Sequence, residues 1–107
     1  TYYQDIKDSF EEIGEDIKSS YNNVMKAYYT NDKKVALEIE LNHENLIEKC
    51  NKFLENAGKR SSMEINASKQ HQVPSKKNMV TIANIVEFKK SALSYIRRIA
   101  RIVLSSD

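Results

Sequence analysis

The sequence predicts an all-α protein, an antiparallel three-helix bundle with a long loop between the second and third helices. Apolar residues recur with helical period over residues 2–29, 33–57 and 75–105, and strand-type alternation is essentially lacking. The 107 residues suffice for one hydrophobic core, so we expect a single domain over residues 1–107. Because the first residue is Thr1 and not Met, we also expect that the domain can be a fragment of a longer chain.

The first helix is predicted by two apolar rows in which residues recur every seven positions. One row is Tyr3, Phe10, Ile17 and Val24, and the second contains Ile6, Ile13 and Ala27. Gly14 lies inside this pattern, where it costs about 1 kcal/mol relative to alanine. Residues 30–32 read Thr-Asn-Asp, a turn whose side-chain oxygens can cap the next helix. So short a connection predicts that the first two helices run antiparallel.

The second helix is predicted over residues 33–57, with Val35, Ile39, Leu46, Cys50, Phe53 and Ala57 on one row. Gly58 follows the last periodic residue, and a left-handed C-cap there is least costly for glycine. The sequence therefore predicts that the helix ends at Ala57 and that residues 58–74 form a basic, polar loop. Pro74 and Ser75 are typical of a helix start and predict the third helix from residue 75.

The third helix is unusually apolar. On a helical projection its apolar residues fill an arc of about 200°, whereas a surface helix needs little more than about 100°. We therefore expect a second bundle to cover part of it, either a homodimer partner or a second helical domain. The residues expected to bind a protein partner are Tyr95, Ile96, Ile99, Lys90, Arg97 and Arg101.

The chain has few residues of the types that carry out catalysis, and we expect that the protein is not an enzyme. The two glycines lie far apart, which excludes a glycine-rich phosphate-binding loop. Cys50 lies on an apolar row and is expected to be a buried, inert thiol, and His43 is expected at a solvated edge. A carboxylate-bridged metal enzyme needs several Glu-x-x-His pairs, and the chain has only Glu40 with His43. No run of about 18 apolar residues occurs, so we expect no membrane insertion. The single cysteine excludes an internal disulfide and fits a reducing compartment, so we expect a cytoplasmic location.

Five acidic residues lie within nine positions of the first helix. Glu11 with Glu15, and Glu12 with Asp16, have the i,i+4 spacing that brings two carboxylates to one helix face. Oxygen ligands on one face can bind a metal ion, which makes Glu11, Glu15, Glu12 and Asp16 the candidate ligands. The alternative is a solvated acidic face that pairs with the basic arc of the third helix.

A helical nucleic-acid-binding module is a second interpretation. It uses the cations of the third helix together with those of residues 59–77, which are Lys59, Arg60, Lys69, Lys76 and Lys77. The net charge of only +2 disfavours it, because nucleic-acid-binding domains usually have a stronger basic footprint.

The chain resembles PhoU-like domains. Residues 24–36, with the Ala-Tyr-Tyr-Thr-Asn-Asp turn, and residues 37–53 are similar to the family's first hairpin, and residues 82–103 to its last helix. The resemblance implies a non-catalytic regulator of phosphate uptake that contacts a phosphate transporter or another regulator, often as paired bundles or dimers.

Some family members bind metal through Glu/Asp-x-x-x-Asp in the last helix. Here Ser91 stands where that aspartate is expected, and Tyr95 where an asparagine is often found. A closer string, Phe-Glu-Glu-Ile-Gly-Glu, occupies residues 10–15 of the first helix. The resemblance thus implies that any bound iron, zinc or manganese would lie at Glu11 and Glu15.

Overall fold

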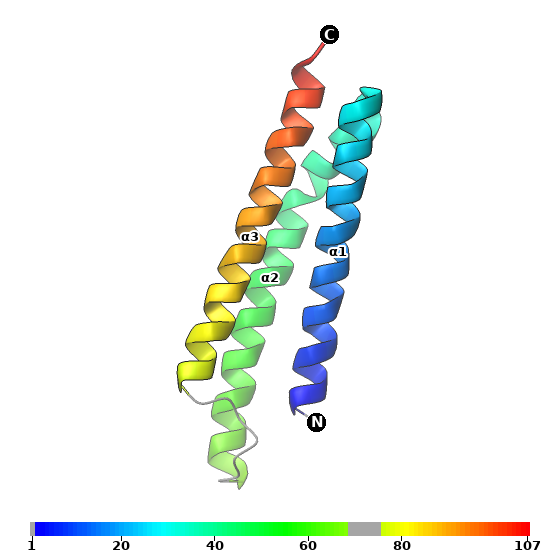
Figure 1. Ribbon diagram of the computed structural model, residues 1–107. Helices are drawn as coiled ribbons and strands as arrows, with labels where there is room; N and C mark the ends of the chain where they lie inside the picture. Colours follow the sequence, from blue (N-terminus) through cyan, green and yellow to red (C-terminus); the bar gives the residue numbers. More distant parts are fainter. Residues whose placement is uncertain (1, 69–75) are drawn as a thin grey trace.

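Three long helices make up the computed structural model, which describes the backbone of residues 2–68 and 76–107 and the side chains of residues 4–58 and 78–107. Helix α1 spans Tyr2–Thr30, α2 spans Lys33–Ser68 and α3 spans Lys76–Ser105. Each helix packs against the other two in a rod of 60 × 19 × 16 Å. Helix α2 runs antiparallel to its neighbours, so α1 and α3 are parallel (Figure 1). The predicted all-α three-helix bundle is confirmed.

The turn between α1 and α2 forms as its residues predict. Asn31 adopts φ 53°, in the left-handed region that asparagine tolerates better than most residues. Asp32 caps α2, because its Oδ1 accepts a hydrogen bond of 3.2 Å from the Val35 amide. The end of α3 is tied to this turn, since the Ser106 hydroxyl donates to Asn31 Oδ1 at 2.8 Å and the Lys33 ammonium donates to the Ser106 carbonyl.

Helix α2 is longer than predicted, and the expected C-cap at Gly58 is wrong. The helix continues through Gly58, which has no positive φ, to Ser68. A glycine weakens a helix by about 1 kcal/mol but does not end it when the rest of the helix is well supported. Of the loop predicted over residues 58–74, residues 58–68 are helical, and the remainder lies outside the described part of the chain. Figure 1 shows α2 extending beyond the neighbouring ends of α1 and α3.

The core lies along the line where the three helices meet, in two clusters. The cluster nearer the start of α1 consists of Ile13, Cys50, Phe53, Val86 and Leu93. The cluster nearer the α1–α2 turn consists of Val24, Ala36, Ile96, Ala100 and Val103. At the edge of the first cluster the Phe10 and Phe53 rings pack at a centroid distance of 5.3 Å. The apolar rows predicted on the first two helices therefore supply the side of the core opposite α3.

Replacing Gly58 with alanine should stabilise the protein. A Cβ built on Gly58 meets only Met79 Cε, at 4.0 Å, which is an ordinary contact distance. Alanine in a helix interior is favoured over glycine by about 0.5–1 kcal/mol, so the urea midpoint should rise. Destabilisation by Gly58→Ala would instead indicate a left-handed cap at this position.

Ile96→Asp should unfold the protein, whereas Phe88→Asp should not. Ile96 is 4% exposed, and its replacement loses core packing and buries a carboxylate, at a cost of about 4 kcal/mol or more. That is a large part of the 5–15 kcal/mol that typically stabilises a domain. Phe88 is 76% exposed on the same helix and serves as the matched control. Circular dichroism checks both, and equal loss of helicity would contradict the assignment of Ile96 to the core.

Candidate protein-docking surface

A row of apolar residues on α3 remains largely uncovered by the bundle. Its residues alternate in spacing by three and four positions, and we call them the α3 seam: Ile85, Phe88, Ala92, Tyr95, Ile99 and Ile102. Phe88, Tyr95 and Ile102 are 76%, 62% and 54% exposed, Ile85 lies at the edge of exposure, and Ala92 and Ile99 are half-buried. Two-stranded coiled coils have this spacing on the face that contacts the partner helix.

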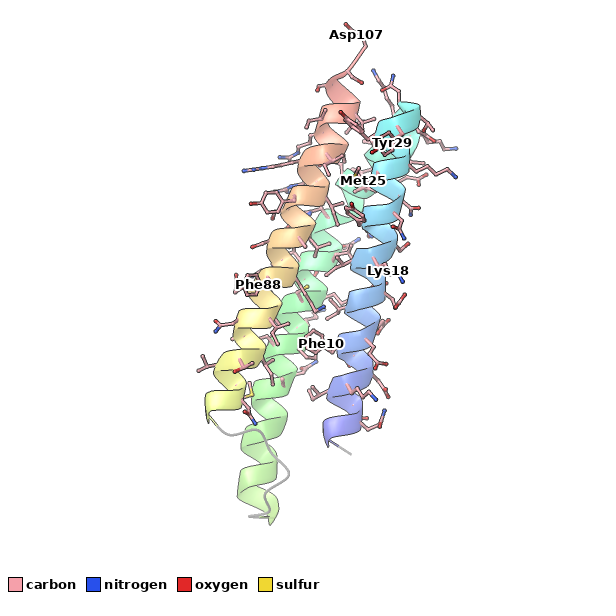
Figure 2. All side chains as sticks on the ribbon, viewed as in Figure 1. Phe10, Lys18, Met25, Tyr29, Phe88 and Asp107 are labelled. Carbon is pink, nitrogen blue, oxygen red and sulfur yellow. The ribbon has the colours of Figure 1, made fainter. Side chains whose placement is uncertain are left out.

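The seam is exposed because another face of α3 already fills the core. Val86, Leu93 and Ala100, seven residues apart, are at most 2% exposed against α1 and α2. Figure 2 shows Phe88 projecting from the outer side of α3, away from α1, whereas Phe10 lies among the helices. A contiguous row of exposed apolar side chains on a small protein is typical of an interaction surface.

Polar residues border the seam on the side toward α2. The Glu87 carboxylate lies 3.4 Å from the Lys90 ammonium, and the Arg98 guanidinium lies over the Tyr95 ring at 5.5 Å from its centroid. These residues line an open groove of about 360 Å³ together with Ile47, Ser91 and Ser94. The apolar seam thus has a polar rim, as protein–protein interfaces usually do.

Among the described side chains, two ion pairs join α3 to α2. Arg101 donates to both carboxylate oxygens of Glu40, with Nη2 at 2.8 Å and Nε at 3.0 and 3.1 Å, and Arg97 Nη1 lies 3.4 Å from Glu44 Oε1. Hydrogen bonding to Arg101 lowers the pKa of Glu40 below its usual value. The basic arc of α3 is therefore partly neutralised within the bundle, and the acidic partners of Arg97 and Arg101 belong to α2.

The four candidate metal ligands of α1 divide into two pairs. Lys49 of α2 lies 3.0 Å from Glu12 and 2.7 Å from Asp16, and these hydrogen bonds raise the pKa of Lys49. The predicted pairing of this acidic face with the third helix is wrong for these two residues, because α2 supplies the cation. Glu11 and Glu15 are exposed and border a separate open groove.

Within the described side chains, no group of three or more histidine, cysteine and acidic residues is arranged to hold a metal ion. Of the four candidate ligands, Glu12 and Asp16 are bonded to the Lys49 ammonium, and Glu11 and Glu15 border a separate groove. The metal site stays a prediction from the sequence.

His43 is buried, so the expectation of a solvated edge position is wrong. It is 5% exposed and belongs to a row of α2 in which residues recur every seven positions. The other members are Ala36, Cys50 and Ala57, each at most 1% exposed. That spacing was the available signal. Desolvation lowers the pKa of His43, and the nearby charge of Arg97 lowers it further. Cys50 is buried as predicted, and burial raises the pKa of its thiol, which makes it a poor nucleophile.

The residues expected to bind a partner have different positions. Tyr95 is exposed in the middle of the seam and Ile99 is half-buried at its edge, but Ile96 packs in the core and cannot contact a partner. Three expected cations are engaged within the chain, namely Lys90 with Glu87, Arg97 with Glu44 and Arg101 with Glu40.

Sequence reasoning missed two of the three most exposed members of the seam, Phe88 and Ile102. The broad apolar arc contained them, but the arc alone does not separate core from surface. The regular alternation of spacings of three and four from Ile85 to Ile102 could have identified them.

Comparison with known proteins adds no relative. The chain matches no protein-family model, no curated protein and no solved structure. In the described part of the chain, no helix has the length and apolar character needed to cross a membrane.

Stability should fall as the pH drops below about 6.5, the ordinary pKa of histidine. The folded-state pKa of His43 is lowered, so the unfolded state binds more protons, and stability is complete above that pH and decreases toward the folded-state pKa. Urea denaturation of the wild type between pH 7.5 and 5 should show this decrease, and His43→Gln should reduce it.

His71→Gln is the matched control, because the chain has two histidines. If His71→Gln removes the slope, or if the slope is unchanged in His43→Gln, buried His43 is not its source. Glu40 contributes at a lower pH. Because its folded-state pKa is lowered, protonation of Glu40 decreases the stability only below about pH 4.5, the ordinary pKa of glutamate.

Proposed function

We propose that this protein is a non-catalytic binding module that docks a helix of a protein partner on the α3 seam. The observation that carries the proposal is the exposed seam itself. It extends over about 26 Å of helix, and each of its six residues is apolar. A partner helix with complementary apolar spacing would bury Phe88, Tyr95 and Ile102, which the bundle leaves more than half exposed.

The surroundings of the titratable residues favour binding over catalysis. In the described part of the chain, the perturbed carboxylate Glu40 and ammonium Lys49 are bonded to structural partners, and His43 and Cys50 are buried. The grooves described above open to solvent, whereas catalytic sites usually converge on a concave, partly desolvated pocket.

We further propose that this binding serves phosphate-transport regulation in the cytoplasm, with a phosphate transporter or one of its regulators as partner. The support for this setting is the resemblance of residues 24–53 and 82–103 to PhoU-like domains. The binding mode and the physiological setting have separate support, and a test can separate them.

Nucleic-acid binding has weaker support. Arg97 and Arg101 are engaged by Glu44 and Glu40, and Arg98 lies over Tyr95. Cations that already neutralise carboxylates release fewer counterions on binding phosphates, so they contribute less affinity. The five lysines and arginines of residues 59–77 lie outside the described side chains.

Photo-crosslinking tests the proposal. A photoreactive phenylalanine analogue replaces Phe88 in the native cell, and a parallel variant carries it at Tyr29, which is 78% exposed on α1 outside the seam. We expect a discrete protein adduct from position 88 and none from position 29. Mass spectrometry of the adduct then identifies what lies on the seam.

The outcomes separate the two parts of the proposal. Equal labelling at both positions, or adducts with nucleic acid only, would contradict docking on the seam. A discrete adduct with a protein that is neither a phosphate-transport component nor a second copy of this chain, under both phosphate-rich and phosphate-poor growth, would contradict the physiological setting and leave the docking surface in place.

A further inference from the structure

We propose that the occupant of the seam is a second copy of this chain, whose α3 lies antiparallel to the first. This inference deepens the proposed function and rests on it. A two-fold pairing of this kind is isologous, so one self-complementary surface serves both copies. The seam must then be complementary, in side-chain size and in charge, to an identical seam that runs in the opposite direction.

The sizes match in the antiparallel direction. Around a point between Leu93 and Ser94, positions at equal distance from the centre come to the same level. Ile85 then faces Ile102, Phe88 faces Ile99, and Tyr95 faces Ala92. Small residues opposite large ones fill space well, so Ala92 of one copy leaves room for the Tyr95 ring of the other. Parallel pairing would instead set Ala92 against Ala92 and Tyr95 against Tyr95.

The charges also match in this direction. On the polar border of the seam, Glu87 lies in the first half and Arg98 in the second half. Antiparallel pairing brings Glu87 of one copy to within about two residues of the level of Arg98 of the other. Among the described residues Arg98 has no ion pair, because its guanidinium packs on the Tyr95 ring. It is therefore available to a carboxylate of the second copy, and parallel pairing would place like charges at the same level.

The exposed area is sufficient for a modest dimer. A buried aromatic side chain covers about 150–250 Å², so the exposed parts of Phe88 and Tyr95 represent about 270 Å² per copy. Ile85, Ile102 and the polar border enlarge this area toward the lower end of the 1,200–2,000 Å² that stable interfaces bury in total. We therefore expect a dimer that forms at micromolar concentrations.

Sedimentation equilibrium over about 1–500 µM tests the association. The wild-type chain should be dimeric in the upper part of this range, and Phe88→Ser and Tyr95→Ser should each weaken dimerisation at least about tenfold. Tyr29→Ser removes an equally exposed ring from α1 and should leave the dimer unchanged. Circular dichroism confirms that each variant is folded, which their exposure leads us to expect.

A spin-label distance tests the orientation. A nitroxide on Ser105→Cys lies about 11 residues from the centre, so antiparallel copies place the two labels about 35 Å apart. Parallel copies would place them within about 20 Å. Buried Cys50 stays unlabelled in the folded protein. A charge exchange gives an independent check, because Glu87→Arg and Arg98→Glu should each weaken the dimer and the double variant should recover it.

Each remaining outcome overturns the inference. A wild-type monomer at 500 µM, a dimer that Phe88→Ser does not weaken, or labels within 20 Å would each contradict it. The proposed function fails separately, in the crosslinking experiment. A monomer whose seam crosslinks to a different protein contradicts self-association and supports the binding module.

Discussion

Helices α1 and α3 both pack on one narrow row of buried residues on α2. Ala36, His43, Cys50 and Ala57 recur every seven residues, and each is at most 5% exposed. Three of the four are small, so α1 and α3 can approach α2 closely along its length. Helices packed on such a row are held by dispersion and apolar burial from both sides, and the ion pairs at the edges contribute less.

This close packing explains why the core does not bury all of the apolar residues of α3. The face of α3 that packs against the other helices consists of four buried residues, Val86, Leu93, Ile96 and Ala100. The seam lies on another face of α3, outside this contact. Arg97 and Arg101 then lie at the α2–α3 boundary, where their alkyl stems can cover apolar surface while the guanidinium groups reach Glu44 and Glu40. One helix therefore combines a core face, an ion-paired edge and an uncovered face.

Sequence reasoning was most successful where one periodic signal dominated. The three helices, the turn at residues 30–32 and the Asp32 cap are confirmed because local chemistry decides them. The C-cap prediction at Gly58 is wrong, because a glycine preference of about 1 kcal/mol does not end a helix whose backbone continues to Ser68. The prediction for His43 is wrong because this residue, although polar, lies in the buried row of Ala36 and Cys50.

For α3 the sequence predicts more apolar surface than one helix of a bundle needs, but it does not divide that surface into core and seam. Ile96 and Tyr95 are neighbours in sequence, yet one is 4% and the other 62% exposed, since a rotation of 100° separates them. Assigning each required the direction of the core, which depends on how α1 and α2 are placed. The periodicity of a helix can be predicted from one sequence. The rotation of the helix about its own axis relative to its neighbours is harder to predict, because it depends on the positions of the other helices.

The parallel course of α1 and α3 has a consequence for how the chain folds. Gly14 lies beside Lys89, and Asn31 is bonded to Ser106, so contacts between these helices join residues about 75 positions apart. Helices α1 and α2 meet across a turn of only two residues, Asn31 and Asp32, and their contacts are local near the turn. Because closing a long loop costs more entropy than closing a short one, we expect the contacts between α1 and α3 to form later in folding than the contacts of either helix with α2.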